Sequence, residues 1–109
     1  MNPTLTEPDS GRHLRLAVGD SFTVRLAENA TTGFTWEADL HDTPWLDLAE
    51  ATTNYPNPEG RVGVGGEATF RFQVRAPGTG TLALKYRRPW EDATSVAKTF
   101  ILTLDARAP

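Results

Sequence analysis

The chain has 109 residues, of which 39% are hydrophobic and 23% charged, which is typical of one compact domain with a single core. Its formal net charge of −3 argues against a nucleic-acid partner, because phosphates favour a basic surface. The sequence has no cysteine, which excludes disulfides, thiolate metal ligands and a cysteine nucleophile. No apolar run approaches the roughly 20 residues of a transmembrane helix, so we expect no membrane partner.

The N-terminal segment shows neither a targeting signal nor a strand pattern. Residues 1–8 lack the basic and apolar stretches of a signal peptide. The sequence therefore leaves two locations open: the cytoplasm if the chain is complete, or a secreted or periplasmic location if a signal peptide was removed. We expect residues 1–11 to form a mobile N-terminal extension and residues 12–106 to form a single domain.

Apolar and polar side chains alternate along most of the chain. Successive side chains of a strand point to opposite faces, so each alternating segment buries one face and exposes the other. The pattern predicts strands, in chain order, at about residues 14–18, 22–26, 34–40, 45–53, 68–74, 82–86 and 100–104. Short strands at this spacing, separated by turn residues, predict an all-β fold, an immunoglobulin-like β-sandwich of about seven antiparallel strands.

The order of the predicted strands indicates where their connections lie. If each strand runs antiparallel to the one before, the connections fall alternately at the two ends of the domain. The connections at about residues 29–33, 54–66 and 88–94 then share one end, as the binding loops of immunoglobulin variable domains do.

The first two of these connections have ordinary interpretations when taken alone. Residues 29–34 read Asn-Ala-Thr-Thr-Gly-Phe, and a simple turn suits Asn and Gly, which tolerate positive φ. Residues 60–66 read Gly-Arg-Val-Gly-Val-Gly-Gly, but a phosphate-binding loop needs a helix after it and here a strand follows. A flexible connector and a backbone that lies flat against another protein both remain open.

The third connection, residues 87–92, reads Arg-Arg-Pro-Trp-Glu-Asp. A Trp beside Pro at a loop tip is difficult to explain as core, and Trp and Arg are typical anchors of interfaces. The alternative is a Trp90 that folds back onto the rim of the sandwich. Three unusual connections at one end favour binding.

The motifs Asn-x-Thr-Thr-Gly-Phe, Gly-x-Gly-Gly and Arg-Pro-Trp occur in this order between the predicted strands. Together they resemble the chagasin-type inhibitors of papain-like cysteine proteases, and the resemblance extends from about Leu14 to Leu104. The resemblance implies an immunoglobulin-like fold and an inhibitor rather than an enzyme. It also implies a papain-like cysteine protease as partner, and we expect a monomer without cofactor or metal ion.

The resemblance further implies a wedge of three loops. Thr31 and Thr32 would lie over the catalytic Cys–His pair, residues 63–66 would run along one side of the cleft, and Trp90 would contact an aromatic surface on the other side. The implied protease-binding residues are Asn29, Thr31, Thr32, Gly33, Phe34, Gly63, Val64, Gly65, Gly66, Arg88, Pro89 and Trp90. Ala30 departs from the family, which often has Pro there, so we expect a looser free loop and a change in affinity.

An enzyme is a weaker alternative. The only histidines are His13 and His41, and no serine lies in a recognisable nucleophile motif. Asp39, His41 and Asp42 offer a candidate metal site at a turn. One His with two carboxylates is not a specific zinc pattern, so a polar turn with a solvated His is favoured.

A second alternative is a non-inhibitory immunoglobulin-like binding or adhesion module for a carbohydrate or protein ligand. Trp90 with Tyr55 or Trp45 would then form a carbohydrate platform. Basic side chains that face outward on two successive strands offer an anion-binding face, and they are Arg71, Arg75, Lys85 and Arg87. Alternating charge, however, usually marks only a solvated face of a sheet.

Overall fold

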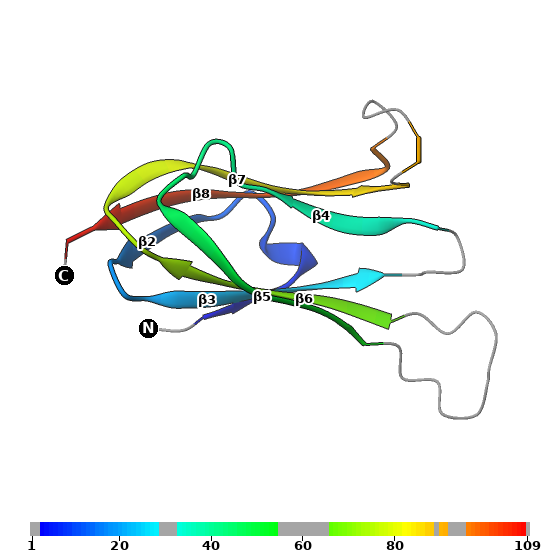
Figure 1. The fold of residues 1–109 in the computed structure, drawn as a ribbon, viewed down its shortest axis with the longest axis horizontal. Helices are drawn as coiled ribbons and strands as arrows, with labels where there is room; N and C mark the ends of the chain where they lie inside the picture. Colours follow the sequence, from blue (N-terminus) through cyan, green and yellow to red (C-terminus); the bar gives the residue numbers. More distant parts are fainter. Residues whose placement is uncertain (1–2, 29–32, 55–65, 89, 92–95, 109) are drawn as a thin grey trace.

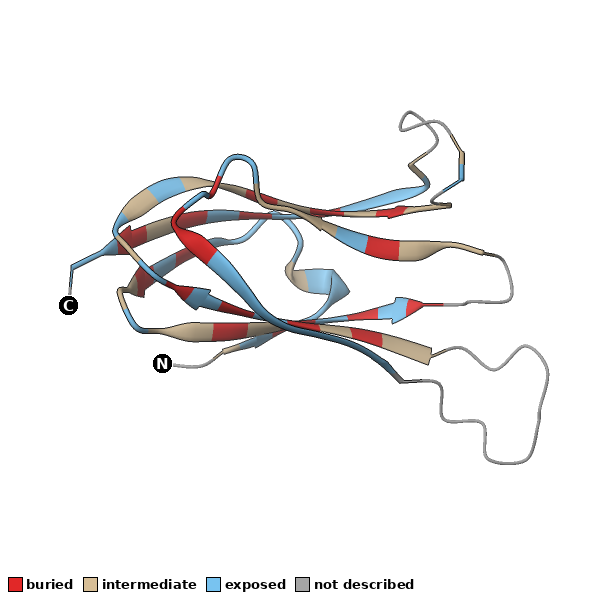
Figure 2. Cartoon of the chain, viewed as in Figure 1, coloured by how far each residue is buried: buried red, intermediate tan, exposed pale blue. Residues whose placement is uncertain are grey.

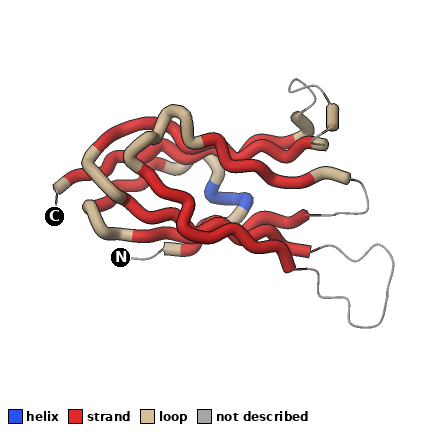
Figure 3. Tube along the Cα trace, in the orientation of Figure 1, coloured by secondary structure: helices blue, strands red, loops and turns tan. Residues whose placement is uncertain are grey.

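The computed structural model describes residues 3–28, 33–54, 66–88, 90–91 and 96–108. These residues form eight β-strands and one short 3-10 helix (Figures 1 and 3). In chain order the elements are β1 (Thr4–Leu5), η1 (Glu7–Asp9), β2 (His13–Ala17), β3 (Ser21–Glu28), β4 (Thr35–Asp39), β5 (Leu46–Asn54), β6 (Gly66–Val74), β7 (Gly78–Arg87) and β8 (Lys98–Arg107). No helix among the described residues is long and apolar enough to cross a membrane.

The strands form two four-stranded sheets that face each other, with orders β1-β3-β6-β5 and β2-β8-β7-β4 (Figure 1). The predicted β-sandwich is therefore confirmed, with eight described strands rather than seven. Pairing is antiparallel except at two edges, where β1 runs parallel to β3 and β2 runs parallel to β8. The first two strands, which flank η1 in the chain, thus join opposite sheets.

The N-terminal segment contributes to this fold. Leu5 pairs with Val24 of β3, and its side chain is only 1% exposed. Farther along, the Gly11 N–H donates to the Ile101 carbonyl at 2.7 Å. The structure thus adds residues 3–11 to the domain that the sequence outlined as 12–106. A two-residue strand is too short to show the alternation by which the other strands were predicted.

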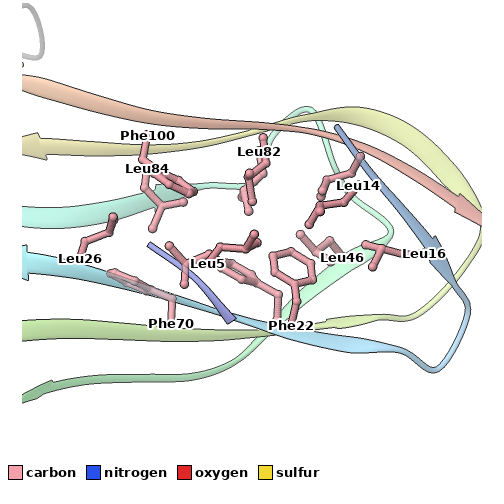
Figure 4. Packing of buried hydrophobic residues seen from close by; sticks show 14 of the residues in the cluster. Leu5, Leu14, Leu16, Phe22, Leu26, Leu46, Phe70, Leu82, Leu84 and Phe100 are labelled. Atoms are coloured by element: carbon pink, nitrogen blue, oxygen red, sulfur yellow. The ribbon is translucent and has the colours of Figure 1, made fainter. Parts of the chain in front are cut away.

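The core lies between the sheets and consists of the inward-facing residues of each strand. Figure 2 shows buried residues alternating with less buried ones along the strands, as the period of two predicted. Figure 4 shows the side chains meeting from both sheets, among them Phe22, Leu26, Phe70 and Leu84. Each fully buried side chain of this kind stabilises the fold by roughly 1.5–3 kcal/mol. Since the chain has no disulfide, this burial is the main source of stability.

One end of the sandwich is closed by the connection between β4 and β5. The indole of Trp45 is 7% exposed and packs against Gly78 at the start of β7. Beside it, the Asp42 carboxylate accepts a 2.7 Å hydrogen bond from the Thr81 N–H. This end is opposite to the one from which the predicted binding loops leave, because β5 begins here and β3 ends at the other.

Candidate functional site

The strands that carry the three predicted binding loops all end together. In one sheet Glu28, the last residue of β3, pairs with Gly66, the first residue of β6, and β5 ends next to them at Asn54. In the other sheet Thr35 at the start of β4 pairs with Arg87 at the end of β7. Figure 1 shows these strand ends at the same end of the sandwich. The predicted convergence is confirmed for the strand ends that bound the loops.

Five of the predicted binding residues belong to the described part of the chain. Gly33 lies against Trp90, Phe34 lies beneath Arg88, and Gly66 begins β6. The others lie outside the described residues: Asn29, Thr31, Thr32, Gly63, Val64, Gly65 and Pro89.

Trp90 is the most exposed of the large hydrophobic residues that the structure describes, at 72%. It follows Arg88 in a turn that the Glu91 N–H closes by donating to the Arg88 carbonyl at 3.1 Å. The indole is therefore exposed to solvent and is not part of the core. A large aromatic side chain held in water is typical of a contact residue.

An aromatic column supports this end of the molecule from within. The ring of Phe34 stacks on Tyr86 with centroids 5.2 Å apart, and Tyr86 packs on Trp36 at 4.8 Å. Tyr86 and Trp36 are both buried. Phe34 thus connects the first loop to the core, and aromatic pairs of this geometry add roughly 0.5–1.5 kcal/mol beyond area burial.

Glu28 is a structural residue of this end that the sequence analysis missed. Its carboxylate is buried, at 5% exposure, and Oε1 accepts a 2.9 Å hydrogen bond from the Trp36 N–H. The indole N–H of Trp36 donates to the Ala27 carbonyl at 2.8 Å. These bonds join the end of β3 to the start of β4 across the two sheets. The alternation through Leu26 already places residue 28 on the inward face, and that signal was available.

Arg87 holds the base of the third loop. Its Nη1 lies 3.2 Å from a carboxylate oxygen of Glu37, and its Nη2 donates to the Glu91 carbonyl at 2.8 Å. One guanidinium therefore ties the turn that bears Trp90 to the neighbouring strand β4. The planar guanidinium makes the two contacts from two different nitrogens, Nη1 and Nη2.

Residues 15–104 match the family model of the chagasin family peptidase inhibitors, I42. The chain belongs to this family. Chagasin from Trypanosoma cruzi is 31% identical over 109 residues, covering 97% of this chain and 99% of chagasin. Amoebiasin-2 from Entamoeba histolytica is 31% identical over 88 residues, covering 80% of this chain and 71% of its own length. The crystal structure of a cysteine protease inhibitor from Entamoeba histolytica has a TM-score of 0.84 at 26% identity, covering 97% of this chain and 96% of that chain.

Membership of the chagasin family confirms the resemblance found in the sequence. The family consists of proteinaceous inhibitors, so the chain is not an enzyme.

The candidate metal site of this chagasin-family chain is a hydrogen-bonded turn. Asp39 accepts bonds from His41 Nδ1 at 2.8 Å and from the His41 N–H at 3.1 Å, and Lys85 Nζ lies 3.3 Å from its other oxygen. The hydrogen bonds from the His41 side chain and backbone lower the pKa of Asp39 to about 2. Asp42 is engaged separately by Thr81. Within the described ranges, no group of three or more His, Asp or Glu side chains is placed to hold a metal ion.

The carbohydrate platform suggested by the sequence is wrong for the pair Trp90 and Trp45. Trp45 is buried against Gly78 at the end of the sandwich away from Trp90. Tyr55, the other suggested partner, lies outside the described residues.

The suggested anion-binding face is also wrong. Arg71 and Arg75 belong to β6, whereas Lys85 and Arg87 belong to β7, and these strands lie in different sheets. The chain crosses between the sheets after β6, so the outward faces of the two strands point in opposite directions. The four basic side chains therefore form no common face.

Proposed function

We propose that this chagasin-family chain inhibits papain-like cysteine peptidases by inserting the loop end of its sandwich into the active-site cleft, with Trp90 as a principal anchor. The observation that carries the proposal is the position of Trp90. Its indole is 72% exposed at the end where the strands of all three family motifs terminate. Family membership supplies the class of target.

The chemistry of the target explains why a loop that occupies its cleft inhibits it. A papain-like site binds an extended peptide and attacks its carbonyl with a thiolate. A loop that fills the cleft without presenting a carbonyl to the thiolate blocks substrate and is not cut. We assign Thr31 and Thr32 to the position over the Cys–His pair, residues 63–66 to one side of the cleft, and Pro89 and Trp90 to the other.

The described scaffold suits this mode of binding. The strand ends are joined across the sheets by Glu28 and Trp36, and the base of the third loop is held by Arg87. Strand ends that are already held in place do not have to be ordered when this end docks, which lowers the entropy cost of binding. An interface of standard size, about 1,600 Å², then gives tight binding when its anchors are well buried.

A titration of papain activity tests the proposal. Adding the chain to papain of known active-site concentration should abolish activity stoichiometrically and reversibly, and the recovered inhibitor should be uncut. A trypsin-like serine peptidase serves as control and should keep its activity. Full papain activity at micromolar concentrations of the chain would refute the proposal and favour a non-inhibitory binding module.

A second experiment tests the assignment of the glycine-rich loop. Deleting residues 63–65 should weaken inhibition while leaving the thermal unfolding of the sandwich nearly unchanged, because the deletion keeps Gly66, at which the paired strand β6 begins. Equal inhibition by the shortened chain would show that this loop does not contribute to the interface.

A further inference from the structure

The first and third loops contact each other through Gly33 and Trp90. Gly33 has φ +79°, a conformation that side-chain-bearing residues rarely adopt. A Cβ atom built on residue 33 would lie 3.0 Å from Cζ2 and 3.3 Å from Cζ3 of Trp90, and nearer still to Cη2. The six-membered ring of the indole therefore occupies the space that any other side chain would need.

A second contact joins the same loops through their neighbouring residues. The guanidinium carbon of Arg88 lies 4.5 Å from the centroid of the Phe34 ring, within the range of a cation–π interaction. Arg88 Nη1 also lies 3.5 Å from Glu91 Oε1. The cation thus lies between the aromatic ring of the first loop and the carboxylate of its own turn.

We name the four residues Gly33, Phe34, Arg88 and Trp90 the loop clasp. It is anchored on both sides: Phe34 stacks on buried Tyr86, and the turn that bears Trp90 is held by Arg87 through the Glu91 carbonyl. Trp90 is exposed to water over most of its surface, yet one edge of its ring has a fixed neighbour.

We propose that the loop clasp fixes the orientation of the Trp90 indole in the free protein. In this proposal Gly33 is a positioning residue that acts through Trp90, and Phe34 and Arg88 hold the two loops together beside it, whereas the sequence resemblance made all three protease contacts. The proposal rests on the proposed function for its effect on inhibition. An aromatic anchor held in place before docking loses less freedom on binding, so the clasp increases affinity without adding contacts.

The exposure of Trp90 makes the clasp testable without unfolding the protein. A methyl group at residue 33 displaces the exposed indole toward solvent, so the fold tolerates the change while the anchor moves. Gly33→Ala carries one further cost, the strain of a Cβ at positive φ. Gly19→Ala is the matched control, because Gly19 has φ +95° and no heavy atom within 4 Å of the added Cβ.

Comparing the inhibition of papain by the two variants separates the effect of backbone strain at positive φ from the effect of displacing the Trp90 indole. We expect Gly33→Ala to raise the inhibition constant by about tenfold or more and Gly19→Ala by less than about twofold, with similar falls in melting temperature. In the Trp90→Ala background the Gly33→Ala change should alter the inhibition constant by less than about twofold. Equal effects of Gly33→Ala in both backgrounds would show that residue 33 does not act through Trp90, and would overturn the proposal.

A measurement on the free protein tests the clasp independently of inhibition. In an NMR spectrum the Gly33 Hα resonances should be displaced by the ring current of Trp90 and should return to ordinary values in Trp90→Ala. Absence of this displacement would overturn the clasp even if the chain inhibits papain. If the displacement is present but papain is not inhibited, the proposed function fails and the clasp stands.

Discussion

Replacing Trp90 by alanine is the most direct test of the binding end. A Trp side chain buries roughly 150–250 Å² when it is covered. Since residue 90 is 72% exposed, on the order of 150 Å² remains for a partner to cover. At about 25 cal/mol per Å² this area corresponds to at most about 4 kcal/mol, and truncated interface anchors typically cost 2 kcal/mol or more. We therefore expect Trp90→Ala to raise the inhibition constant for papain at least about 30-fold.

The same variant should affect folding much less. Because residue 90 is already 72% exposed in the free protein, loss of the indole should lower the free energy of unfolding by about 1 kcal/mol or less, a few degrees in melting temperature. Trp45→Phe is the contrasting change, because Trp45 is buried at the opposite end. It should lower the melting temperature and leave the inhibition constant unchanged.

Two results would refute this reasoning. An unchanged inhibition constant for folded Trp90→Ala would show that the indole is not part of the interface. A large fall in the melting temperature of Trp90→Ala, comparable to that of a core substitution, would show that the indole belongs to the interior.

Three further predictions concern stability. Leu5→Ala should lower the free energy of unfolding by about 2–4 kcal/mol in urea titration, since the side chain is 1% exposed. Gly78→Ala should lower it by about 1–3 kcal/mol, because the added Cβ would lie 2.7 Å from Cγ of Trp45. Asp39→Asn should be less stable at pH 7 by about 1 kcal/mol, allowing for partial exposure. Hydrogen bonds from His41 depress the pKa of Asp39 to about 2, so this stabilisation is present above about pH 4 and is lost as the pH falls through 2.

Each of these has a clear contradicting outcome. Full stability of Leu5→Ala would mean that β1 contributes nothing to the domain. A neutral Gly78→Ala would show that the indole of Trp45 moves aside at no cost. A stability gap between Asp39→Asn and the parent chain that is as large at pH 2 as at pH 7 would contradict the depressed pKa of the carboxylate. None of these changes should alter inhibition of papain by the folded protein, because all lie away from the loop end.

Much of the fold was predictable because strand periodicity is a local property. The alternation in residues 68–74 and 100–104 identified both the strands and their buried faces, and the order of the strands predicted a common end for three loops. The short strand β1 was missed, since two residues carry no period. Its contribution comes from Leu5, whose burial depends on contact with distant β3.

The candidate site was predictable as a set of motifs but not as an arrangement. Trp45 and Trp90 each follow a proline in a connection between strands, so their local sequences are alike. Only the packing shows that Trp45 is buried and Trp90 exposed. Arg88 was expected to contact a protease, whereas its cation lies over Phe34 of another loop. Such pairings join residues more than fifty positions apart, and no local pattern encodes them.

The sequence by itself determined that the chain alternates into strands, which faces those strands bury, and that it carries the family motifs, because these depend on residue order over short distances. The tertiary structure alone decided which strands share a sheet, which placed Arg71 and Lys85 on opposite faces. It alone also decided that Gly33 provides the space for Trp90. Both depend on how distant segments meet in space, where shape and solvent exclusion act rather than chain order.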